Sequence, residues 1–254
     1  MDQCTIRERV EVSWLTQGSV VLQARLDEVK GKLLDLLFPP RCIGCGKEGA
    51  YICAPCCRGM PRLSPPFCPT CGRQLVHEEW CSSCRRLKLD IDAICTPFAF
   101  QGVLRQAIHR LKYGGFKSLA LPLAHLLTQQ VENRPLPAEV LVPVPLHPRR
   151  LRERGYNQSG LLAQELGRLT AIPVEEDTLV RHRNSRAQVK TSDSEERRSN
   201  VLGAFDCRGE KLKGRRILLI DDVCTTGATL NSCAIALKKA GASSVWGLAL
   251  AREV

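Results

Sequence analysis

Two adjacent carboxylates, with a short hydroxyl-rich loop behind them, are the part of the sequence best suited to chemistry. Asp221 and Asp222 follow the apolar run 217–220. The loop residues behind them are small or carry hydroxyls: Thr225, Thr226, Gly227, Ala228 and Thr229. The free amides of such a loop, at the start of a helix, suit a phosphate dianion. Because the carboxylates would repel that phosphate, we expect them to face sugar hydroxyls of the same ligand. The alternative is a plain turn between a strand and a helix.

Eight cysteines form four CxxC pairs within 43 residues. They are Cys42 and Cys45, Cys53 and Cys56, Cys68 and Cys71, and Cys81 and Cys84. Two intervening residues let both sulfurs of a pair face one ion, and four thiolates complete a tetrahedral, structural zinc site. The spacing is duplicated, because a CxxCG pair precedes a CxxC pair twice. Duplication favours two zinc sites built from consecutive pairs. An interleaved arrangement and an iron–sulfur cluster are the alternatives.

The elements that would position the carboxylates alternate along the chain after residue 91. Apolar runs predict strands at 139–146, 216–220 and 244–250. Periodic apolar residues predict helices near 104–111 and at 118–131, 157–169 and 226–240. This alternation indicates an α/β fold, a parallel sheet flanked by helices on both faces. We expect the polar residues 181–200 to form a mobile loop.

The N-terminal part of the chain has a different character. An apolar stripe between residues 19 and 38 predicts an amphipathic helix, which Pro39 and Pro40 stop. Residues 41–90 lack a periodic pattern, so bound metal must order them. We therefore divide the chain into an N-terminal segment at 1–40, a double zinc ribbon at 41–90 and an α/β domain at 91–254.

Charge and composition limit the kinds of ligand and partner that the sequence indicates. The formal net charge is +11, of which +2 lies in residues 1–100 and +9 in residues 101–254. Two Zn(Cys)₄ centres, each of charge −2, would lower the total to +7. A basic domain indicates phosphate-bearing ligands or nucleic acid, and a merely basic surface is the alternative. The sequence shows neither a secretory signal nor a membrane-spanning run, so we expect a cytoplasmic protein without membrane insertion, whose cysteines bind metal.

The segment from Arg216 to Thr229 resembles the PRPP (phosphoribosyl pyrophosphate) signature of type I phosphoribosyltransferases. The resemblance implies that Asp221 and Asp222 hold the ribose hydroxyls as the catalytic acidic pair, and that the loop 225–229 holds the 5-phosphate. Further segments at 111–114, 142–159 and 188–205, with the cysteine ribbon, resemble the ComF family. That wider resemblance implies a type I phosphoribosyltransferase-like domain behind a zinc ribbon, and a role with imported DNA.

Arginines behind the predicted strand 139–146 extend the resemblance. Arg149, Arg150 and Arg154 lie where phosphoribosyltransferases cradle pyrophosphate in a loop, and guanidinium groups bind such oxyanions with paired hydrogen bonds. We expect Lys112 to reach the same anion. Solvated surface cations are the alternative. Asn157 can cap the helix that follows.

Three functions remain open on these observations. The first is a ComF-type protein that binds PRPP with Mg²⁺, contacts single-stranded DNA and works with the DNA-uptake machinery. The second is an active phosphoribosyltransferase that transfers ribose 5-phosphate to a nucleobase or amine. The third is a zinc-stabilised scaffold with a vestigial site. We favour the first, and the sequence does not decide whether the protein is an enzyme.

Overall fold

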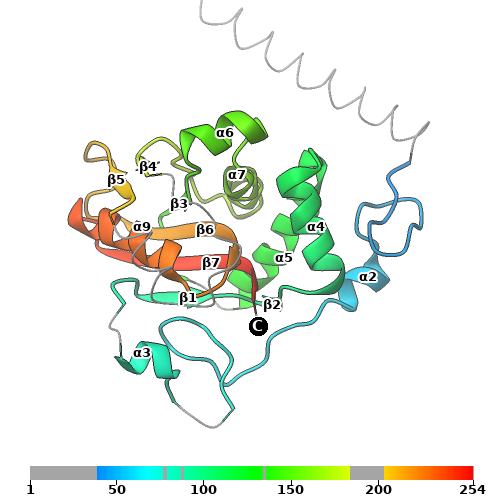
Figure 1. Ribbon diagram of the computed structural model, residues 1–254, viewed down its shortest axis with the longest axis horizontal. Helices are drawn as coiled ribbons and strands as arrows, with labels where there is room; N and C mark the ends of the chain where they lie inside the picture. Colours follow the sequence, from blue (N-terminus) through cyan, green and yellow to red (C-terminus); the bar gives the residue numbers. More distant parts are fainter. Residues whose placement is uncertain (1–38, 77–78, 87–88, 134–135, 184–202, 254) are drawn as a thin grey trace, which may run out of the picture. The chain divides into compact units, whose positions relative to one another are not determined.

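The computed structural model describes residues 39–76, 79–86, 89–133, 136–183 and 203–253 (Figure 1). The chain forms two compact units, Met1–Cys53 and Ala54–Val254. The helix predicted within 19–38 and most of the loop predicted at 181–200 lie outside the described residues.

The helices and strands of the second unit follow one another as the sequence predicted, with short additions. The helices are α2 (Ala54–Arg58), α3 (Ser82–Arg86), α4 (Gly102–Tyr113), the 3-10 turn η1 (Lys117–Leu119), α5 (Ala120–Asn133), α6 (Pro148–Arg154), α7 (Gln158–Thr170) and α9 (Ala228–Lys239). The strands are β1 (Ala93–Cys95), β2 (Phe98–Ala99), β3 (Val140–Pro143), β4 (Leu179–Arg181), β5 (Phe205–Cys207), β6 (Arg216–Cys224) and β7 (Ser244–Arg252). None of the helices in the described ranges is long and apolar enough to cross a bilayer.

A parallel sheet organises this unit. Its strands lie in the order β1-β7-β6-β3, and β2 also pairs with β7 in parallel. Successive side chains of a strand point to opposite faces, so Ile217 and Leu219 of β6 pack with Leu230 and Leu237 of α9. Helices α5 and α7 contact the sheet from its other face (Figure 1). The predicted α/β sheet with helices on both faces is therefore confirmed. A two-stranded antiparallel sheet, β4-β5, packs against α9.

Two predicted boundaries at the carboxylates are wrong. Strand β6 does not end at Ile220 but continues to Cys224, because β7 pairs with it as far as Arg252. Helix α9 begins at Ala228 rather than at residue 226. Its N-cap, Gly227, has φ +83°, a left-handed conformation that glycine adopts without strain. Asp221 and Asp222 therefore lie inside the last part of a strand.

The arginine segment expected to be a loop is a short helix, α6. The ring Nδ1 of His147 accepts a hydrogen bond from the Arg149 amide at 3.2 Å and caps the first turn. Pro148 occupies the first helical position, where its missing N–H leaves no bond unmade. Gly155, at φ +79°, ends the helix. Hydrophobic periodicity does not predict this helix, because only these flanking residues signal it.

Candidate functional site

The two adjacent aspartates are buried and held by three side chains from other elements. Asp221 Oδ1 accepts a hydrogen bond from Ser159 Oγ at 3.1 Å. Asp222 Oδ1 accepts one from Gln158 Nε2 at 3.0 Å, and Asp222 Oδ2 forms an ion pair with Lys112 Nζ. Asp222 and Asp221 are 2% and 9% exposed. The carboxylates are thus fixed in place before any ligand arrives.

Their surroundings give the two carboxyls different proton affinities. Burial, reinforced by the charge of Asp222, raises the pKa of Asp221 to about 7. Burial also acts to raise the pKa of Asp222, but the Lys112 ammonium outweighs it and holds that pKa below its usual value. Burial acts to lower the pKa of Lys112, and the charge of Asp222 raises it instead. The site therefore holds a buried ion pair beside a carboxyl whose pKa is raised toward neutral pH.

Of the predicted phosphate loop 225–229, residues 225–227 connect β6 to α9, and Ala228 and Thr229 begin α9. A Cβ on Gly227 would lie 2.9 Å from Ile94 Cδ1, so any other residue there would require the Ile94 side chain to shift. The hydroxyl of Thr226 accepts a hydrogen bond from the Ala228 amide at 3.3 Å. The loop follows the carboxyl end of a parallel strand, which is where ligands bind in open α/β sheets. The structure thus places the predicted loop at the carboxyl ends of the parallel strands.

A cavity of about 510 Å³ brings together three of the four predicted pyrophosphate cations. Lys112, Arg150 and Arg154 line it, together with Glu153. Arg149 pairs instead with Glu153, Nε to Oε1, at 2.9 Å on the exposed side of α6. The cavity therefore brings Lys112, Arg150 and Arg154 together, while Arg149 partly neutralises its acidic lining residue, Glu153.

Gln158 and Ser159 are the residues of this site that the sequence analysis missed. They open helix α7, and both are buried although polar. Gln158 joins the two halves of the site, since it donates to Asp222 and its Oε1 accepts from Arg154 Nη1. Asn157 caps α7, as its position predicted, by accepting from the Ser159 amide at 3.1 Å. The available signal was two polar residues on the first turn of a predicted helix. Their role depends on their burial, which the sequence does not show.

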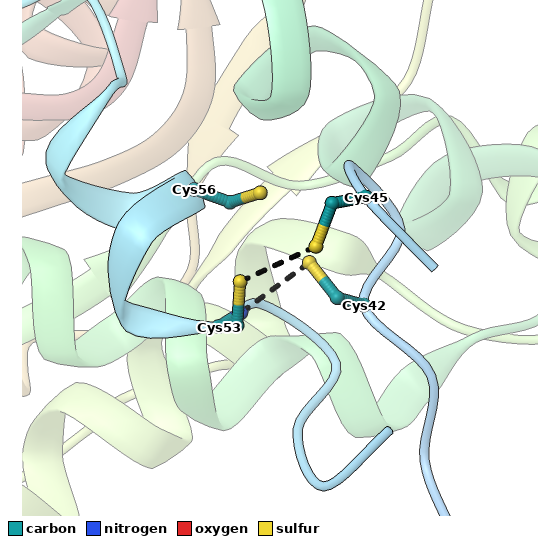
Figure 2. Close-up of side chains that lie close together, drawn as sticks. All are labelled: Cys42, Cys45, Cys53 and Cys56. Carbon is teal, nitrogen blue, oxygen red and sulfur yellow. Dashed lines mark hydrogen bonds between the residues drawn. The ribbon is translucent and has the colours of Figure 1, made fainter. Parts of the chain in front are cut away.

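The eight cysteines group into two sets of four, and Figure 2 shows the first of the two. The sets are Cys42, Cys45, Cys53 and Cys56, and Cys68, Cys71, Cys81 and Cys84. This is the consecutive arrangement that the duplicated spacing favours. Within each set the sulfurs all lie within 4.8 Å of one another.

The donor set and its geometry fit zinc. Sulfurs bound to one zinc ion at about 2.3 Å are roughly 3.8 Å apart. The Sγ atoms of Cys45 and Cys53 are 3.5 Å apart, and those of Cys71 and Cys81 are 3.6 Å apart. Burial acts to raise the pKa of Cys42, but amide hydrogen bonds, first from Cys53, outweigh it and lower that pKa to about 6. Both sets therefore fit a double zinc ribbon.

Comparison with known proteins agrees with these two parts. The family model of the double zinc ribbon domain matches residues 33–85, and that of the phosphoribosyl transferase domain matches residues 152–251. Competence protein F of Haemophilus influenzae is 33% identical over 231 residues, which cover 84% of this chain and 98% of that protein. Competence protein ComFC of Bacillus subtilis is 31% identical, covering 82% of this chain and 86% of that protein. DNA utilization protein YhgH of Escherichia coli K12 is 31% identical, covering 80% and 91%. The chain therefore belongs to the ComF family of competence and DNA utilization proteins, with a double zinc ribbon and a phosphoribosyltransferase-type domain.

Proposed function

We propose that this protein binds PRPP together with Mg²⁺ and uses that site while handling single-stranded DNA. The observation that carries the proposal is the buried pair Asp221 and Asp222, fixed by Lys112, Gln158 and Ser159 directly before a phosphate-type loop. Burial of two adjacent carboxylates is expensive, and a plain strand has no need of it. A ligand with hydroxyls next to a phosphate accounts for the arrangement.

The three parts of PRPP match three neighbouring features. The 5-phosphate suits the amides and hydroxyls of 225–229, and the ribose hydroxyls suit the carboxylates of Asp221 and Asp222. The diphosphate suits the cavity lined by Lys112, Arg150 and Arg154. Mg²⁺ prefers oxygen ligands, which the diphosphate supplies. Gln158, which touches both Asp222 and Arg154, supports the ribose and diphosphate ends at once.

An exposed group of aromatic rings and cations beside that cavity supports the DNA part of the proposal. Tyr113 and Phe116 are 68% and 40% exposed. The guanidinium of Arg154 lies 5.1 Å from the centre of the Tyr113 ring, and that of Arg110 lies 5.4 Å from the centre of the Phe116 ring. Bases stack on such rings while the cations pair with phosphates, without strong preference for sequence. We expect this surface to hold single-stranded DNA next to the PRPP site.

PRPP binding is tested by calorimetry on the zinc-loaded protein with Mg²⁺. We expect the wild type to bind PRPP and the Asp221→Asn/Asp222→Asn variant to lose at least about 100-fold in affinity, because the removed charges can no longer hold the ribose hydroxyls strongly. Asp206→Asn, a change at an exposed aspartate of β5, is the matched control. Equal affinity in both variants and the wild type would exclude a role for the carboxylate pair, and an absence of binding by the wild type would exclude the proposal.

DNA binding is tested by fluorescence anisotropy with a labelled oligonucleotide. Tyr113→Ala and Phe116→Ala should each weaken binding roughly tenfold, because base stacking contributes about 1–3 kcal/mol per base. Trp80→Ala is the control, since Trp80 is a comparably exposed ring outside this surface. An equal loss in the Trp80 variant, or none in the others, would place DNA elsewhere.

An assay of PRPP turnover distinguishes a PRPP-binding protein from an active phosphoribosyltransferase. Release of pyrophosphate from PRPP in the presence of single-stranded DNA, a nucleobase or an amine would identify a phosphoribosyltransferase. Intact PRPP in every case would identify a PRPP-binding protein.

A further inference from the structure

We propose that Arg252 couples the second cysteine set, Cys68 to Cys84, to the phosphate loop 225–229, so that metal bound at this set raises the affinity for PRPP. The effect on PRPP affinity rests on the proposed function, whereas the contacts of Arg252 are observed in the structure. Arg252 ends strand β7 and takes no part in the site as described above.

Arg252 is a buried cation that touches the zinc ribbon and the phosphate loop at once. Its side chain is among the largest that are fully buried, and the residue is 1% exposed. Nη2 donates to the carbonyl oxygen of Cys71, and Nη1 donates to the carbonyl oxygen of Thr225 at 3.0 Å. Nε donates to Thr96 Oγ1 at 3.2 Å. The planar guanidinium donates to these three acceptors from three separate nitrogens, whereas a lysine ammonium would have to reach all three from one nitrogen.

A second path joins the same two places through β1. The amide of Ile94 donates to the carbonyl oxygen of Thr70 at 2.8 Å, between the ligands Cys68 and Cys71. Gly72, at φ +69°, lies so close to β1 that a Cβ there would be 2.1 Å from the Ile94 carbonyl oxygen. On the other side, the Ile94 side chain fills the space next to Gly227. Ile94 is thus packed between the cysteine turn and the phosphate loop.

Metal bound at the second set would hold in place the carbonyl groups of Cys71 and Thr70, where the two paths begin. The apolar cluster around this turn consists of Cys68, Cys71 and Cys81, with Leu75, Cys84 and Leu89 packed against it. A metal ion bound there would hold the sulfurs of Cys68, Cys71, Cys81 and Cys84 at fixed positions. When the ligands move, the Cys71 carbonyl moves with them, and Arg252 loses an acceptor that orients it toward Thr225. Coupling between two sites is reciprocal, so PRPP must also strengthen metal binding at this set.

The first test removes one ligand from each set in turn. Cys84→Ser disables the second set, and Cys53→Ser, at a similarly half-buried ligand of the first set, is the matched control. We expect Cys84→Ser to weaken PRPP binding roughly tenfold in calorimetry with Mg²⁺, within the usual range of coupling. It should also speed amide hydrogen exchange in the segment 224–229. Cys53→Ser should leave both close to wild type.

The second test addresses Arg252 itself. Arg252→Lys keeps the charge but serves only part of the three acceptors, so we expect it to bind two zinc ions and still lose roughly tenfold in PRPP affinity. If this variant does not fold, zinc release from the wild-type protein tests the coupling instead. PRPP with Mg²⁺ should then slow the release of one of its two zinc ions to a chromophoric chelator roughly tenfold, and leave the other unchanged.

The outcomes separate the coupling from the proposed function. If the wild type binds no PRPP, the proposed function fails, while hydrogen exchange in 224–229 still decides whether the second set and the loop are coupled. If exchange and PRPP affinity are the same in the wild type and Cys84→Ser, and PRPP leaves zinc release unchanged, the coupling is wrong.

Discussion

Replacing Lys112 by methionine should destabilise the protein by about 3–5 kcal/mol, because it leaves a buried carboxylate without its cation. Asp222 is 2% exposed, and Lys112 Nζ is the ion-pair partner of its Oδ2. The hydrogen bond from Gln158, which would remain, does not neutralise the charge. Urea unfolding of the zinc-loaded protein at neutral pH measures the loss.

A second substitution should restore most of that stability. In Lys112→Met/Asp222→Asn the charge that lost its partner is removed as well, so the double variant should be more stable than Lys112→Met alone. Lys211→Met is the control, because Lys211 forms an exposed pair with Glu175 at 3.3 Å, and such pairs contribute about 0–1 kcal/mol. If Lys112→Met costs no more than Lys211→Met, the ion pair is not a main support of the site.

The sequence predicted the sheet well because its buried strands are uniformly apolar. Strand β6 reads Ile-Leu-Leu-Ile before the aspartates, and the helices on either side show clear periodicity. The short strands β1 and β2 lacked such a signal, since their places depend on pairing with β7, which is about 150 residues away in sequence. Helix α6 was hidden for a related reason, because a run of arginines has no apolar stripe.

The candidate site likewise has one part that the sequence indicated and another part that only the fold brings together. The loop 225–229 and the cysteine sets are contiguous in sequence or regularly spaced, so the residue types alone pointed to them. The partners of the carboxylates come from α4 and α7, and only the fold brings Lys112 and Gln158 to Asp222. The role of Arg252 was invisible for the same reason, since its acceptors at residues 71, 96 and 225 belong to three separate segments.

The raised pKa of Asp221 makes stability depend on pH in a direction that can be measured. A carboxyl whose folded-state pKa is about 7, against 3.8 for an ordinary aspartate, stabilises the fold while protonated, and this contribution is lost as pH rises through 7. Between pH 5.5 and pH 8 the loss should be about 2 kcal/mol, at 1.36 kcal/mol for each pH unit below the folded pKa. Asn at this position cannot ionise, and its Oδ1 can still accept from Ser159. The free energy of unfolding of Asp221→Asn, relative to the wild type, should therefore be about 2 kcal/mol higher at pH 8 than at pH 5.5.

Urea unfolding of both proteins at pH 5.5 and pH 8 gives this difference, in which zinc-ligand titration cancels. Glu175→Gln is the control, because the hydroxyl of Thr178 and then Lys211 lower the pKa of Glu175. Its contribution is present above the unfolded pKa and is lost only in more acidic solution, so its effect should be equal at pH 5.5 and pH 8. A pH-independent difference for Asp221→Asn would mean that Asp221 is ionised throughout this range. The buried site would then carry two negative charges opposed by Lys112, and a ligand that brings Mg²⁺ would meet a more strongly anionic pocket than the structure indicates.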